Sequence, residues 1–202
     1  MTTDDLLFRI RRIYASIDAA QEFDMSKLPA RVERDDRAIS IMQDFSGGLS
    51  DADLENIAHT VIHNLANLED HLRRWAARNG QDAGKVGLVL AESLALRIIK
   101  DLSNNDKHGH PPRDGGHSRT APRLAEVTRV LRLTTGAETG SGVVVTLGRM
   151  GVPVISGSGS AAAVITARVV DKEGNNLGDL FEIQQQGIQA GKASCRTLEC
   201  KA

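Results

Sequence analysis

The 202-residue sequence predicts an α+β protein in which helices come first and an antiparallel sheet follows. Three observations support this prediction. Apolar residues recur at helical spacing through the first half, a His-, Pro- and Gly-rich segment follows, and short Val-, Ile- and Thr-rich segments separated by glycine come after it. The predicted parts are a helical bundle of about four helices over 1–108, a flexible loop or linker over 109–123, an antiparallel β module over 124–190 and an irregular tail over 191–202.

Four helices are expected in the first part. Apolar spacing predicts the first over residues 4–23 and a second over 30–45. The third is predicted over 50–78, because it begins with a serine followed three residues later by an acid and is stopped by Asn79-Gly80. The fourth is predicted as one helix over about 82–108. A short connection makes it the antiparallel neighbour of the third.

The second part has the composition of strands and turns. Polar and glycine residues at 171–176 predict a hairpin turn that leads into 177–183, and a short helix is predicted near 183–189. The strands are predicted over residues 126–135, 143–147, 152–155 and 161–170.

Composition and charge argue against only a few classes of function. The net charge is −1, so no global field attracts nucleic acid or membrane, although residues 97–132 carry eight Lys or Arg against four Asp or Glu. Aromatic residues are few, which argues against base-stacking platforms. Cys195 and Cys200 form neither a disulfide framework nor a zinc set. With no signal peptide or membrane-length apolar run in the pattern, we expect a cytoplasmic protein without membrane contact.

Polar residues on the third helix form the first half of a candidate site. At about 100° per residue, Asn64 and His71 fall at the edge of the apolar stripe, and His63 and Asp70 lie further toward solvent. His59 lies at the outer edge of the same arc.

The fourth helix supplies the second half. Asp101, Asn105 and His108 fall along one edge of its apolar stripe, and Lys107 lies beside them. The register between the two helices depends on the loop that joins them, so the pattern does not tell which of these residues meet.

Three interpretations of these residues stay open. In the first, they form a buried polar network that fixes helix packing. In the second, they perform acid–base chemistry on a phosphate-bearing ligand such as RNA. The third is metal binding: His59 and His63 are spaced to share one metal, but the pattern offers no convincing third ligand. We therefore predict no metal and no cofactor.

The segments HNLANLEDHL and NDKHG resemble those of a group of uncharacterised bacterial and phage α+β proteins. The resemblance covers roughly residues 52–181. It carries over seven positions and implies no particular activity: His63, Asn64, Asp70, His71, Asn105, Lys107 and His108.

A second, weaker resemblance is to the HEPN helical ribonucleases of toxin and defence systems, which use an Arg and a His at a helix end, usually at a dimer interface. His108 ends a predicted helix here, and Arg97 lies eleven residues before it.

Together with the acid–base interpretation, this resemblance makes a metal-independent ribonuclease or RNA-binding protein the expected function, with a homodimer as one assembly. His71 and His108 would be the acid–base pair and Asp101 would orient them. Asn64, Asn105, Lys107, His63 and Asp70 would bind substrate. The alternative is a non-catalytic interaction or structural protein, so whether the chain is an enzyme stays open.

Overall fold

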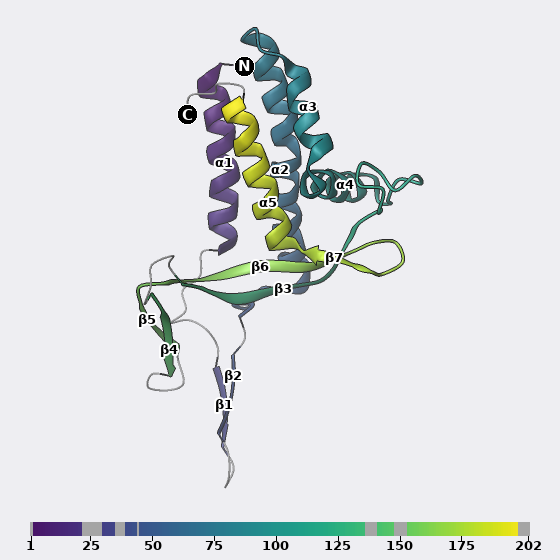
Figure 1. The fold of residues 1–202 in the computed structure, drawn as a ribbon. Helices are drawn as coiled ribbons and strands as arrows, with labels where there is room; N and C mark the ends of the chain where they lie inside the picture. The colour runs from purple at the N-terminus through teal and green to yellow at the C-terminus, as the bar shows by residue number, and fades with distance from the viewer. Residues whose placement is uncertain are drawn as a thin grey trace.

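The computed structural model describes residues 2–21, 30–34, 39–43, 45–135, 141–147 and 153–197. It is an α+β fold (Figure 1), as predicted, with four described helices before the main antiparallel sheet. The helices are α1 Thr3–Gln21, α2 Asp51–Arg78, α3 Ala83–Glu92, α4 Leu94–His108 and α5 Leu180–Thr197. The sheet has the order β3-β6-β7, formed by Arg123–Thr134, Ser160–Val170 and Asn176–Asp179.

The long helix α2 has the ends that its sequence predicts. Ser50 and Asp53 form a capping box: the Asp53 amide donates to Ser50 Oγ at 3.2 Å, and the Ser50 amide donates to Asp53 Oδ2 at 3.0 Å. At the other end Asn79 caps the helix and Gly80 takes a φ of 68°, which a glycine adopts without steric cost. The 28-residue helix therefore spans the whole bundle.

The helix predicted over 30–45 is wrong. The chain forms two antiparallel strands there, β1 (Ala30–Arg34) and β2 (Ile39–Gln43), with Val32 opposite Ile41. The run Ile39-Ser40-Ile41 alternates β-branched and polar residues with period two, which favours a strand over a helix. This hairpin extends away from the helices (Figure 1).

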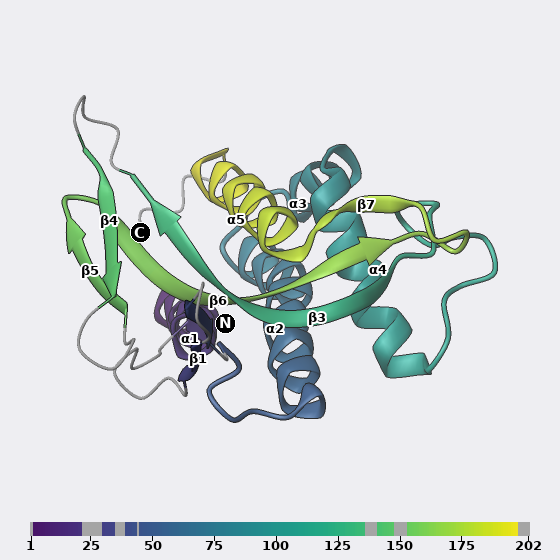
Figure 2. The ribbon, with the colours of Figure 1, turned by 90° about the horizontal axis from the view of Figure 1, so that it is seen from below.

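The single helix predicted over 82–108 is two helices. α3 returns along α2, but the chain turns at Ser93, whose side chain accepts a hydrogen bond from the Leu96 amide at 3.3 Å and so begins α4. Figures 1 and 2 show α4 crossing α2 instead of running antiparallel to it. Gly109, with a φ of 72°, ends α4.

The sheet lies across one end of the helices. β3 and β6 form a long antiparallel ribbon with a bulge between Ala125 and Thr128, and β7 pairs with the other edge of β6. The view from below shows this ribbon curving beneath the helices (Figure 2). A separate hairpin joins β4 (Val143–Leu147) to β5 (Pro153–Gly157). The predicted strands are present: β4 has the ends that were predicted, and the ends of the others differ by up to four residues.

The C-terminal helix is longer than predicted: α5 covers residues 180–197, so the irregular tail predicted from residue 191 is wrong over its described part. Asp179 begins the helix, since its Oδ1 accepts from the Phe181 amide at 2.9 Å. Gly187 and Gly191 lower the helix propensity of α5, and each faces another helix. A Cβ at Gly187 would lie 2.6 Å from Ile99 Cδ1, so glycine there permits close packing on α4.

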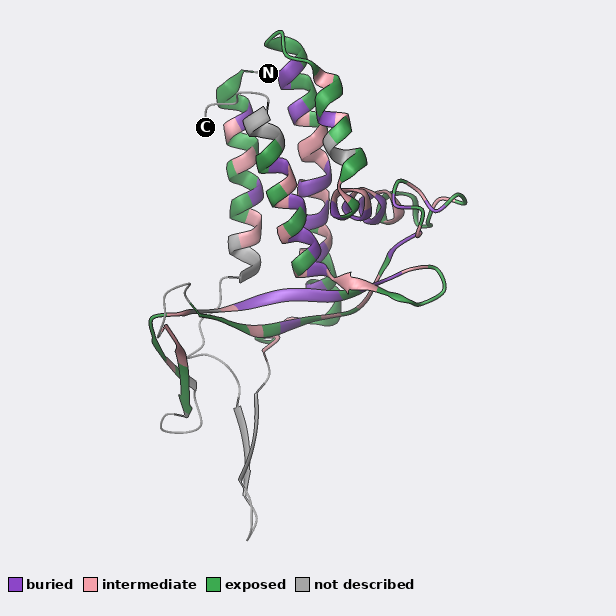
Figure 3. Cartoon of the chain, in the orientation of Figure 1, coloured by how far each residue is buried: buried purple, intermediate pink, exposed green. Residues whose placement is uncertain are grey.

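One hydrophobic core joins the helices to the sheet, as the buried residues in Figure 3 show. It contains side chains of α1, α2, α4, β6 and α5, including Ile13, Ile62, Ile99, Val169 and Leu180. A smaller cluster around Trp75 links α1, α2 and α3. The predicted bundle and β module therefore share a core. Among the described helices, none combines the length and apolar character needed to cross a membrane.

Candidate metal centre

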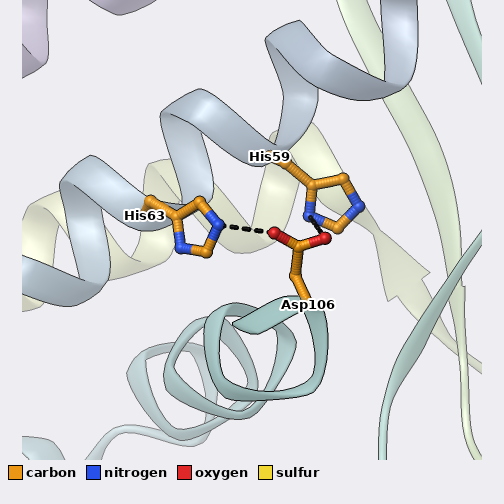
Figure 4. A group of neighbouring side chains, drawn as sticks. All are labelled: His59, His63 and Asp106. Atoms are coloured by element: carbon orange, nitrogen blue, oxygen red, sulfur yellow. Dashed lines mark hydrogen bonds and ion pairs between the residues drawn. The ribbon is translucent and has the colours of Figure 1, made fainter. Parts of the chain in front are cut away.

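Three metal-ligating side chains converge where α4 crosses α2 (Figure 4). His59 and His63 lie one turn apart on α2, with ring centroids 6.2 Å apart, and Asp106 reaches toward them from α4. His63 Nε2 lies 2.7 Å from Asp106 Oδ2, and His59 Nδ1 lies 3.7 Å from Asp106 Oδ1. One carboxylate thus contacts both rings.

The position of His63 is fixed from both sides. Its Nδ1 lies 2.8 Å from the hydroxyl of Ser103, a buried residue of α4 one turn before Asp106. A carboxylate only accepts hydrogen bonds, so the short contact with Asp106 needs a proton on Nε2. With a metal ion at Nε2 the ring would carry its proton on Nδ1 instead, and Nδ1 would donate to the Ser103 hydroxyl, which would hold the ring from behind.

Ser103, His63 and Asp106 have the residue types of a nucleophilic triad, but they cannot act as one. The Ser103 side chain is 1% exposed, so a substrate carbonyl cannot reach its hydroxyl. We therefore assign Ser103 the role of orienting the His63 ring.

The ring of His59 has a nitrogen without a hydrogen-bond partner, and this nitrogen faces the Asp106 carboxylate. Its Nδ1 is buried and has no hydrogen-bond partner among the described residues. Buried polar atoms are nearly always paired, so an orphan beside a carboxylate and a second imidazole calls for an explanation. A cation held by all three groups supplies one.

The donor set fits a transition-metal ion. The three ligand atoms lie within 4.8 Å of one another. Tetrahedral zinc with bonds of about 2.0–2.2 Å separates its ligands by about 3.3 Å. The His59 contact is close to that spacing, and the short His63 contact would open by a small movement of Asp106, whose side chain is 41% exposed. Two imidazoles and one carboxylate leave a coordination position for water.

His59 and His63 were predicted to lie on the solvent-facing side of α2, and this prediction is wrong. Their side chains are 27% and 26% exposed, because α4 packs against that flank of α2. Asp106 and Ser103 were not singled out. The only sequence signal for Asp106 is its place in the last turn of an amphipathic helix.

Asp101 and Asn105, two of the predicted site residues, bind the segment that follows α4. The fully buried Asp101 carboxylate accepts hydrogen bonds from the His117 amide at 2.8 Å, the Ser118 amide at 2.7 Å and the Ser118 hydroxyl at 2.6 Å. Asn105 Nδ2 donates to the Pro122 carbonyl at 2.6 Å. Both side chains therefore hold the 110–122 segment against α4.

His71 faces α1 instead of α4. Partial burial lowers the pKa of its imidazole below the ordinary value of 6.5, and the nearby Arg9 and Arg74 lower it further. Its Nδ1 is buried with no hydrogen-bond partner among the described residues. No contact in the described structure joins it to Asp101 or His108.

The remaining predicted residues are spread over the surface. His108 and Lys107 are exposed at the end of α4, and Asp70 is 50% exposed, 3.9 Å from the Lys100 ammonium. Asn64 is half-buried, as its angle predicts. Of the eight residues predicted to form a site, only His63 belongs to the cluster with His59 and Asp106.

The chain matches no protein-family model, and no curated protein or solved structure is significantly similar to it.

Proposed function

We propose that this protein binds one divalent transition-metal ion through His59, His63 and Asp106, with a coordination position open to water. The observation that carries the proposal is the convergence of two imidazole nitrogens and one carboxylate at the crossing of α2 and α4. Zinc fits this ligand set best, because it accepts mixed imidazole and carboxylate donors in a small coordination shell. Calcium and magnesium prefer oxygen ligands alone.

The ion would act in two ways. It would join α2 to α4, adding to the stability of the helix crossing, because a ligand that binds only the folded state favours folding. It would also polarise a bound water, since the ligand side chains are partly exposed and leave the site open to solvent. Because protons and the ion compete for the same ligand atoms, binding would strengthen as the pH rises.

A zinc titration of chelator-treated, untagged protein by calorimetry tests the proposal. We expect one ion per chain, and at least tenfold weaker binding in His59→Ala, in His63→Ala and in Asp106→Ala. His108→Ala is the matched control: it removes an exposed histidine from the same helix as Asp106 and should leave the affinity within twofold. A Cys195→Ser/Cys200→Ser chain should also bind normally.

Cobalt(II) gives a second readout. A site of two imidazoles and one carboxylate should give visible d–d bands without a thiolate charge-transfer band. The proposal fails if the ligand variants bind as tightly as the wild type, or if binding disappears in the cysteine-free chain.

A structural role for the predicted polar network is the second candidate. Asp101 and Asn105 support it, because each uses its side chain to bind the backbone of the next segment. The ribonuclease interpretation stays a prediction. RNA cleavage that survives chelation and is lost in His108→Ala would support it over metal-based chemistry.

A further inference from the structure

A second feature, independent of the metal centre, is a broad groove beside α4. It has a volume of about 870 Å³ and lies between α2, α3, α4 and the segment 112–119. Its size is that of cavities that take small organic ligands. Arg97, Lys100, Asp101 and Asn104 line it from α4 at helical spacing, so one face of this helix forms its floor.

Most charged side chains of the groove are already paired. Arg73 contacts Glu69 at 2.9 Å, Lys100 contacts the same carboxylate at 3.3 Å, and Arg119 contacts Asp114 at 3.4 Å. The Asp101 carboxylate accepts hydrogen bonds from backbone amides of the segment that follows α4. Among the described residues, these pairs leave Arg97 as the basic side chain of the groove without an acidic partner.

Arg97 is partly buried, and its Nε has no hydrogen-bond partner in the described structure. A guanidinium stays charged at every physiological pH, so burying one of its donors without an acceptor is costly. Its planar fork matches the two oxygens of a carboxylate or phosphate. An oxyanion in the groove would supply the acceptor that Arg97 Nε lacks.

Other donors lie on the same surface. Asn104, two turns after Arg97 on α4, has a carboxamide with no hydrogen bond among the described residues. His117 lines the groove from the 112–119 segment. Both side chains add polar groups to the groove that Arg97 lines.

We propose that this groove binds a small organic molecule through its carboxylate or phosphate group, with Arg97 as the principal anion-binding residue and Asn104 as a second donor. A small ligand fits better than RNA. Glu69, Asp70 and Asp114 also line the groove and would repel a chain of successive phosphates, whereas a single oxyanion can reach Arg97 alone.

The test uses phenyl phosphate and benzoate as probes for the two oxyanions, followed by the NMR signal of the arginine Nε–H groups and by calorimetry on the full chain. We expect one probe or both to shift the Arg97 signal saturably. Arg97→Gln should weaken binding at least tenfold, and Arg97→Lys should also weaken it, because lysine keeps the charge but loses the fork. Asn104→Ala should weaken it several-fold.

Arg113→Gln is the matched control, because it removes the same charge from an exposed arginine that does not line the groove. It should leave probe affinity within twofold. The proposal is overturned if neither probe binds, if a folded Arg97→Gln chain binds both probes as the wild type does, or if Arg113→Gln is equally impaired. Tighter binding of a single-stranded RNA that is weakened alike in Arg97→Gln and Arg113→Gln would also overturn it, in favour of a nonspecific basic surface.

Discussion

Replacing Asp101 by alanine tests most directly what the polar residues of α4 do. The carboxylate is fully buried and accepts three hydrogen bonds, two of them from backbone amides. Alanine would leave the His117 and Ser118 amides and the Ser118 hydroxyl without their acceptor. Since an orphaned buried donor costs about 1–3 kcal/mol, we expect the free energy of unfolding to fall by about 3–5 kcal/mol.

Two further substitutions calibrate this value. Asp101→Asn keeps one acceptor oxygen and turns an amide toward the remaining donors, so a loss of about 2–3 kcal/mol is expected. Asp114→Ala removes a carboxylate from the same segment, but that side chain is 68% exposed. Its effect should stay below about 1 kcal/mol.

Urea unfolding followed by circular dichroism measures these losses, and hydrogen exchange of the His117 and Ser118 amides shows where they arise. Both amides should exchange faster in Asp101→Ala. A loss below about 1 kcal/mol, or one equal to that of Asp114→Ala, would refute the structural role.

Two other predictions concern neighbouring features. Gly116 has a φ of 72°, and a Cβ there would overlap the Asp101 carboxylate, so Gly116→Ala should destabilise the fold by more than about 2 kcal/mol. Gly109 has the same φ in open space, so Gly109→Ala should cost only about 1 kcal/mol, and equal losses in urea unfolding would contradict this account. The lowered pKa of His71 means that the unfolded state takes up its proton first. The stability that depends on a neutral His71 is full above pH 6.5 and is lost as the pH falls through 6.5 toward the folded pKa. The free energy of unfolding of His71→Gln should therefore fall less on acidification than that of the wild type. An equal fall in both proteins would exclude the effect.

Sequence reasoning succeeded where the determinants are local. The ends of α2 depend on Ser50 with Asp53 and on Asn79-Gly80, all within a few residues of the helix terminus. Elements whose local secondary-structure preference is overridden by tertiary contacts could not be predicted from the sequence. Gly191 lowers helix propensity but packs beside Leu68 of α2, so α5 continues where composition favours an irregular tail.

The candidate metal centre could not be predicted from the sequence, because it also depends on tertiary contacts. The spacing of His59 and His63 is visible in the sequence, but their orientation was judged against a single apolar stripe. Asp106 lies 43 residues from His63, and its position opposite the two rings depends on the turn at Ser93. That turn changes the direction of α4, which no periodicity within either helix reveals.

The shared core has a consequence for how the chain is made. A ribosome releases α1, α2 and α4 well before β6 and α5, yet all five contribute to one hydrophobic cluster. Until residues 160–197 emerge, apolar faces of the earlier helices have only each other to cover them. Folding must then close contacts between residues at least 139 positions apart, such as those of α1 with β6, which slows the final step. The nascent chain is therefore most open to aggregation and to chaperone binding during the synthesis of its last strands.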